Sequence, residues 1–318
     1  MVSSRDGGGV STALPGPVNL LGLRIDVDTH DGMRDGVPRL FDLLAEGHAR
    51  GTFYLSMGPD NSGRAIFNLL RPGFLAKMRR TGARGVYGWR TVLSGTLLPA
   101  RMIALALPAV AHQIVDQGHE AGVHAWDHRT WQDRLAEMPP EQVVLSLDRG
   151  RQAFSEIFTT PPRTFAAPAW FSNEVALLHQ ETFGLDFATD CRGDEPFVPM
   201  VGGRALQTPQ VPATLATLDE ALGDSHANAP AFYRDMLDAA CAAPWPVLTI
   251  HAELEGGPYA EDFARFLADA RTRGMAIVPL GELLAARRAT GVPLPQRTMT
   301  YAPVRGRHGV VFRPADPA

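Results

Sequence analysis

One stretch near the N-terminus reads Leu23-Arg24-Ile25-Asp26-Val27-Asp28 and closes an apolar segment that begins at Val18. This pattern predicts a buried strand that ends in two carboxylates. A second stretch reads Gly118-His119-Glu120-Ala121-Gly122-Val123-His124-Ala125-Trp126-Asp127-His128. Its residues 120–125 predict another strand, which contains His124, and His128 follows four positions after His124. Most of the chemistry that the sequence offers lies in these two stretches.

Strands and helices alternate through the rest of the chain. Short apolar runs predict further strands at 51–57, 163–167, 185–189, 247–250 and 275–278. Helical spacing of apolar residues predicts helices at 36–48, 109–117, 141–158, 173–182, 231–243, 259–273 and 280–288. This order indicates an α/β protein built from parallel β-α units. Polar residues of interest follow the strands, at the edge where the active sites of such folds collect.

Composition sets the broad class. The 318 residues suffice for one large domain, and the net charge of −4 gives no reason to expect nucleic acid as a partner. Two cysteines make no disulfide framework. The N-terminal residues lack the apolar run of a secretion signal, and no uncharged apolar stretch is long enough to span a bilayer. We therefore expect a cytoplasmic monomer.

The acidic and histidine residues suggest a metal site. A divalent cation can take two imidazoles and one carboxylate and keep a position for water. Asp28, His124 and His128 form such a set, which leaves Asp26 as a base beside it. Each of these patterns is weak evidence for a metal site by itself, because histidine pairs and neighbouring acids also have structural roles. His251 ends another predicted strand. If its side chain points toward the same site, it would be a natural general acid.

The order of these motifs resembles that of the polysaccharide deacetylases, a family of carbohydrate esterases. The resemblance covers 18–288 and rests on Asp26 and Asp28, Gly-His-Glu-x-Gly-x-His-x-x-x-His, the Pro168/Trp170 segment, Asp190 and His251. It implies a distorted seven-stranded (β/α) barrel with a helical insertion. It also implies one bound divalent cation, and the ligand types suit Zn, or Mn, Co or Fe.

The same resemblance implies roles for individual residues. Asp28, His124 and His128 would bind the metal, Asp26 would take a proton from the attacking water, and His251 would protonate the departing amine. Asp190 would orient His251 and raise its pKa. The expected oxyanion and substrate contacts are Trp170, Pro168, Arg192, Thr29, His30 and Glu253. Ala166 stands where the family has the arginine that holds the base; Arg24 and Arg192 are the candidates to replace it, and we favour Arg192.

A closer similarity narrows the range of possible substrates. Residues 24–29, 36–40, 58–61, 87–89, 124–128, 190–193 and 249–253 are similar to a branch of the family that removes formate from 4-deoxy-4-formamido-L-arabinose carried on undecaprenyl phosphate. This implies a role in supplying aminoarabinose for lipid A modification and polymyxin resistance. The alternatives are a deacetylase of another N-acylated sugar or glycan, and a non-catalytic metal- or lipid-binding relative. The last would be expected to lose Asp26 or His251.

The predicted domain organisation includes a membrane contact. We expect a disordered extension at 1–17, a catalytic domain at 18–290 with an insertion at 60–108, and a basic flexible tail at 291–318. The insertion is apolar and basic but too broken to span a bilayer, so it suits a helix lying at the cytoplasmic face of the inner membrane. An ordinary amphipathic cap on the barrel is the alternative. The expected membrane contacts are Phe67, Leu70, Phe74, Leu98, Met102 and Ile103.

Overall fold

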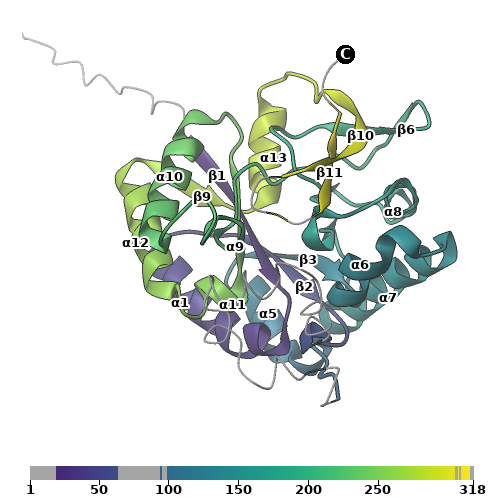
Figure 1. Ribbon diagram of the computed structural model, residues 1–318, viewed down its shortest axis with the longest axis horizontal. Coiled ribbons are helices and arrows are strands. Elements are labelled where there is room, and N and C mark those ends of the chain that lie inside the picture. The colour runs from purple at the N-terminus through teal and green to yellow at the C-terminus, as the bar shows by residue number, and fades with distance from the viewer. Residues whose placement is uncertain (1–18, 64–93, 95–98, 305–306, 308, 316–318) are drawn as a thin grey trace, which may run out of the picture.

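Seven parallel strands form the main sheet of the protein in a computed structural model, which describes residues 19–63, 94, 99–304, 307 and 309–315. The strands follow the order β5-β4-β3-β2-β1-β8, and β9 pairs with the first half of β1. Their bounds are β1 Asn19–Val27, β2 Thr52–Ser56, β3 Glu120–Ala125, β4 Thr164–Phe165, β5 Phe187–Ala188, β8 Val247–His251 and β9 Met275–Val278. The predicted parallel α/β architecture with seven strands is confirmed (Figure 1).

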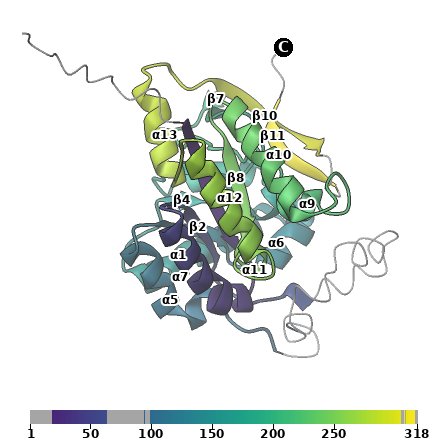
Figure 2. The same cartoon turned by 90° about the vertical axis from the view of Figure 1, so that its left-hand side faces the viewer.

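Helices surround this sheet and bury its outer face (Figures 1 and 2). Leu23 and Ile25 of β1 are fully buried in one cluster with Phe263 of α12 and Leu40 of α1. The helices are α1 Val37–Glu46, α5 Pro108–Asp116, α6 His128–Arg134, α7 Pro140–Phe158, α8 Glu174–Glu181, α9 Leu218–Ala221, α10 Ala229–Ala242, α11 Ala252–Glu255, α12 Ala260–Thr272 and α13 Leu280–Ala289. Because side chains alternate along a strand, Arg24 and Asp26 point to the opposite, inner face.

The sheet curls, and an irregular segment fills the gap between its outer strands β5 and β8. The N–H of Val211 donates to the carbonyl of Ala188 in β5, and the N–H of Leu215 donates to the carbonyl of Val247 in β8. Residues 209–215 therefore lie where an eighth strand would close a barrel. At the amino end of β8, Leu280 and Leu283 of α13 pack with Val247 in the interior of the curled sheet.

A second, four-stranded sheet lies beside the first. It consists of β6 (Val198–Val201), β7 (Arg204–Ala205), β10 (Gln296–Pro303) and β11 (Val310–Pro314), in the order β11-β10-β6-β7. We expected 291–318 to be a flexible tail, and for its described residues this is wrong. Val311 and Phe312 are buried, and β10 pairs with β6, so strand pairing and apolar contacts fix this part of the chain.

The insertion leaves the sheet next to the end of β2. Its two ends are joined, because the N–H of Asp60 donates to the carbonyl of Arg101 and the N–H of Ile103 donates to that of Gly58. Ile103 is 1% exposed, so the prediction that it contacts a membrane is wrong. Met102 is half-buried and lies opposite Pro59.

Several sequence predictions fall on residues that the structure does not describe. Phe67, Leu70, Phe74, Leu98 and the extension at 1–17 lie outside the described residues. Within the part of the chain that is described, no helix has the length and apolar character needed to cross a bilayer.

Candidate metal centre and active site

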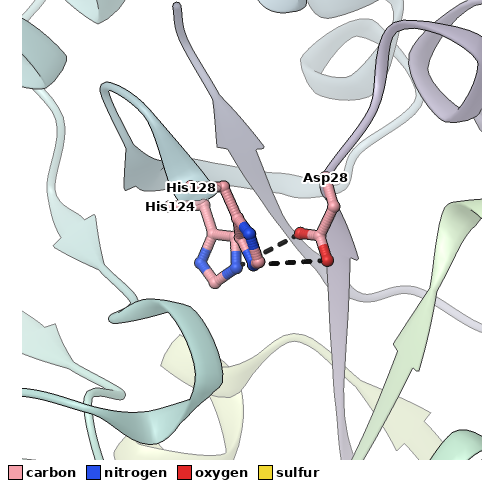
Figure 3. Close-up of side chains that lie close together, drawn as sticks. All are labelled: Asp28, His124 and His128. Carbon is pink, nitrogen blue, oxygen red and sulfur yellow. Dashed lines mark ion pairs between the residues drawn. The ribbon is translucent and has the colours of Figure 1, made fainter. Parts of the chain in front are cut away.

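Asp28, His124 and His128 meet at the carboxyl edge of the main sheet (Figure 3). Oδ1 of Asp28 lies 3.3 Å from Nε2 of His124, and Oδ2 lies 3.4 Å from Nε2 of His128. One potential ligand atom from each side chain lies within 4.8 Å of the others. The structure thus brings together the three residues that the sequence predicts as metal ligands.

Local backbone geometry explains how two histidines four positions apart converge. Leu55 of β2 pairs with Val123 and Ser56 pairs with Ala125, so His124 is an extra residue at a bulge in β3. Bulges of this kind turn a side chain away from the regular pleat. His128 is the first residue of α6, whose N-terminus is capped by Asp127 through the N–H of Thr130 at 2.9 Å. The pair therefore spans a strand end and a helix start.

The three side chains fit a divalent cation. Oδ1 of Asp28 is buried and has no hydrogen-bond partner among the described residues. Nδ1 of His124 lies 2.9 Å from the carbonyl of Ala166, which places a proton on Nδ1, while Nε2 faces Asp28. Burial lowers the pKa of His128 to about 4, so its imidazole is neutral at physiological pH. Neutral imidazoles and an ionised carboxylate are the forms that bind metal.

Asp26 lies beside this centre, held by Arg24. Nε and Nη2 of Arg24 donate to Oδ1 and Oδ2 of Asp26, both at 2.7 Å. Oδ2 of Asp26 lies 3.6 Å from Nε2 of His124. Burial opposes ionisation, but Arg24 and His124 outweigh it and lower the pKa of Asp26, which stays a carboxylate able to accept a proton.

Arg24, and not Arg192, pairs with Asp26, which is the contact expected of the missing family arginine. Arg24 and Asp26 lie two residues apart on β1, so their side chains lie on the same face of the sheet and can pair. Arg24 is fully buried and also donates to the carbonyl of Thr189 at 2.6 Å. Arg192 instead donates to Oε2 of Glu220, so our preference for Arg192 in this role is wrong.

His251 approaches the centre from β8, where the strand register pairs it with Asp26. Its Nδ1 lies 3.9 Å from Oδ1 of Asp219, and its N–H donates to Oε2 of Glu255. Burial disfavours the imidazolium, but Asp219 and the neighbouring acids outweigh it and raise the pKa of His251 to about 9. His251 is therefore protonated at neutral pH, as a general acid must be.

Asp190 does not perform the orienting role that we expected. It is fully buried, and its Oδ2 accepts from Nε2 of Gln210 at 3.3 Å, while burial raises its pKa to about 6. The carboxylate facing His251 belongs to Asp219 of α9. No motif in the sequence marks Asp219, which lies 32 residues before His251.

Glu253 and the residues after Asp28 shape the edge of the site. Oε1 of Glu253 accepts from the N–H groups of Asp28 and Thr29 and from Oγ1 of Thr29, all within 3.0 Å. The N–H of His30 donates to Oδ2 of Asp60 at the base of the insertion. Glu253 and Asp60 therefore fix the loop that presents Asp28.

The Pro168/Trp170 segment forms a tight turn next to Arg24. Ala169 and Trp170 have φ values of 58° and 47°, a left-handed conformation that is uncommon for residues with a side chain. The Trp170 ring lies 5.4 Å from the Arg24 guanidinium and 4.7 Å from those of Arg192 and Arg307. Two consecutive strained residues persist only where their surroundings hold them, and such positions cluster at functional sites.

The sequence model of the polysaccharide deacetylases matches residues 27–188, which include the three predicted metal ligands and the Trp170 turn. The chain belongs to the polysaccharide deacetylase family. Among solved structures, a polysaccharide deacetylase from Mycobacterium smegmatis shares its fold, with a TM-score of 0.61 at 19% identity over 89% of this chain and 95% of the other.

Two curated relatives of this polysaccharide deacetylase carry one name, probable 4-deoxy-4-formamido-L-arabinose-phosphoundecaprenol deformylase. The relative from Shewanella sediminis is 37% identical over 84% of this chain and 86% of its own length. The relative from Wigglesworthia glossinidia brevipalpis is 31% identical over 80% of this chain and 88% of its own.

Proposed function

We propose that this chain is a metal-dependent amide hydrolase that removes formate from 4-deoxy-4-formamido-L-arabinose linked to undecaprenyl phosphate. The observation that supports it best is the arrangement of an ionised Asp26 and a protonated His251 around one three-ligand centre. Hydrolysis of an amide needs both a base for water and an acid for the amine. The curated relatives that cover most of the chain carry this substrate in their names.

Each side chain has a separate task in the proposed reaction. Asp28, His124 and His128 would hold a divalent cation, which would supply Lewis acidity for the activation of water and for the polarisation of the formyl carbonyl. Asp26 accepts the proton of the attacking water, and Arg24 holds its carboxylate in place. His251 donates its proton to the departing amine. The turn at Trp170 lies beside Arg24, and its backbone N–H would stabilise the developing oxyanion.

Formate release tests this proposal directly. The purified protein, loaded in turn with Zn, Mn, Co or Fe, is incubated with the lipid-linked formamido sugar and with its acetamido counterpart. We expect formate from the first substrate, little acetate from the second, and no product after chelation. Acetate release without formate would indicate a deacetylase of another N-acylated sugar. No product with any metal would rule out both.

Two variants separate the base from a ligand. Asp26→Asn should retain metal and lose turnover by at least about 100-fold, because general-base catalysis contributes about 10²–10⁴-fold. His124→Ala should lose the metal itself. Metal content and formate release are measured on both proteins. Equal loss of metal in the two variants would show that base and ligand are assigned wrongly.

We also propose that the enzyme works as a peripheral protein at the cytoplasmic face of the inner membrane, where a polyprenyl-linked sugar is accessible. The base of the insertion supports this, because Asp60 and Arg101 lie next to the loop of Asp28 and His30. Removal of 64–98 should release the protein from sedimented vesicles that contain anionic lipid. If the shortened chain still sediments with them, the insertion does not dock on the membrane.

A further inference from the structure

Two arginines from distant parts of the chain share one aromatic ring and one carboxylate beside the active site. The guanidinium groups of Arg192 and Arg307 each lie 4.7 Å from the Trp170 ring centroid. Nη1 of Arg192 donates to Oε2 of Glu220 at 3.2 Å, and Nη1 of Arg307 donates to Oε1 at 3.1 Å. We call Arg192, Arg307, Glu220 and Trp170 the arginine cluster.

The arginine cluster has more positive charge and more donors than its own carboxylate satisfies. Two guanidinium groups face one carboxylate, and among the described residues each guanidinium donates to Glu220 alone. The side chain of Arg192 is 10% exposed, so its charge has little help from water. Burial lowers the pKa of Arg192 even though Glu220 acts in the opposite direction. Nε1 of Trp170, a donor, is buried with no partner among the described residues.

The arginine cluster adjoins both the base and the acid of the proposed reaction. The other neighbour of the Trp170 ring is Arg24, which holds Asp26. Glu220 follows Asp219 on α9, and Asp219 faces His251. Arg24 pairs with Asp26, and His251 faces Asp219. Among the described residues, Arg192 and Arg307 share a single carboxylate, that of Glu220.

We propose that Arg192 and Arg307 bind the phosphodiester that links the sugar to its lipid carrier. This inference rests on the proposed function, because that substrate carries its amide and its phosphodiester on opposite sides of one sugar ring. A site for the anion must then lie beside the metal centre, and the arginine cluster adjoins that centre through Arg24, which pairs with Asp26, and through Asp219, which faces His251. A planar guanidinium group can donate two parallel hydrogen bonds to phosphate oxygens. An aromatic ring stacked against the guanidinium group holds it in place.

The test compares a charged and a neutral soluble substrate. The first is the methyl phosphodiester of 4-deoxy-4-formamido-L-arabinose, and the second is its methyl glycoside. For Arg307→Met we expect KM for the phosphodiester to rise about 10- to 100-fold with kcat within about two-fold, since one charge-assisted hydrogen-bonding group is lost. Hydrolysis of the glycoside should not change. Arg204→Met, an exposed arginine of the second sheet, is the matched control and should behave as the unmodified protein.

Further measurements separate the alternatives. Arg192→Lys keeps the positive charge but loses the planar guanidinium group, so it should show the same selective rise in KM for the phosphodiester. Equal losses on both substrates, or no loss on either, would mean that the arginine cluster only holds the C-terminal strands in place, and would overturn the proposal. Loss of sedimentation with phosphatidylglycerol vesicles, without a change in KM for the phosphodiester, would assign the site to a bilayer headgroup and also overturn it.

Failure of the proposed function gives a different pattern. The unmodified protein would then release formate from neither substrate. Binding of dimethyl phosphate, measured by calorimetry, still tests the arginine cluster in that case. Binding that Arg307→Met abolishes and Arg204→Met preserves supports an anion site, whereas equal heats in all three proteins contradict it.

Discussion

At the scale of single residues, the paired side chains of Arg24 and Asp26 show how the chain holds its proposed base. A fully buried arginine is costly unless a carboxylate neutralises it, and Asp26 does so with two hydrogen bonds. The same contact fixes the direction of the carboxylate toward the metal centre. One pair therefore serves both the stability of the interior and the chemistry at its edge.

Removing Arg24 should be strongly destabilising. In Arg24→Met the Asp26 carboxylate stays buried without its partner, and we expect a loss of about 3–5 kcal/mol in the free energy of unfolding. Arg24→Met combined with Asp26→Asn should regain much of that loss, because no buried charge is left. Urea unfolding of the metal-free proteins measures both. A double variant as unstable as the sum of its single variants would contradict this account.

The pKa of His251 makes a prediction about pH. The general acid acts in its protonated form, and the pKa of His251 is raised to about 9, so kcat should be steady at neutral pH and fall as the pH rises through about 9. Asp219 is the largest of the contributions that raise this pKa. In Asp219→Asn the fall should begin at a lower pH. A pH profile of kcat with the same alkaline limb in both proteins would remove Asp219 from this role.

At the scale of elements, the site depends on where β3 ends and α6 begins. Asp127 accepts from the N–H and Oγ1 of Thr130 and from Nδ2 of Asn61, so one side chain fixes the helix start and the base of the insertion. His128, the next residue, takes its position from this junction. The spacing of the two histidines in the sequence is useful only because the junction turns both rings the same way.

Asp127→Ala should therefore weaken metal binding as well as the helix. We expect a loss of about 1 kcal/mol in stability, the usual effect of removing an N-terminal cap, together with a measurable drop in zinc affinity. Asn228→Ala is the matched control, since Asn228 caps α10 in the same manner through the N–H of Ala231. The control should lose similar stability and keep its zinc affinity, measured by competition with a chelator. Equal zinc affinities would show that Asp127 does not position His128.

At the scale of the whole molecule, the second sheet ties the end of the chain to the active site. The N–H of Arg192 donates to the carbonyl of Phe312, and the Tyr301 hydroxyl donates to the carbonyl of Ser172, two residues after Trp170. Val311 packs against Trp170. The C-terminal strands thus support the turn at Trp170, and they bring Arg307 to its ring.

The packing of β11 can be tested with two side chains. Phe312 is 2% exposed, and Phe312→Ala should cost about 3–5 kcal/mol of unfolding free energy, as for other buried aromatic residues. Val310 is 45% exposed on the same strand, so Val310→Ala should change stability by less than about 0.5 kcal/mol. Similar small effects from both would mean that the strand is not packed as the structure shows.

Much of the main sheet could be predicted from the sequence, because the spacing of apolar residues and the length of a strand are local properties of the chain. The bounds of β3 and β9 agree with the predicted residues, and the predicted ligands do converge. Strands β7 and β10 of the second sheet could not be found in this way. β7 has two residues, and every residue of β10 is half-buried or exposed, so neither strand shows a buried apolar pattern.

The sequence by itself predicted the parallel α/β class, the proposed ligand set of Asp28, His124 and His128, and the proposed base and acid at Asp26 and His251. Only the tertiary structure decided which side chains tune them. Arg24, Asp219 and Glu220 act through contacts between elements far apart in the chain, and such contacts depend on strand register and on the path of loops. Residue spacing carries no information about either, so a partner can be named only after the fold has placed it.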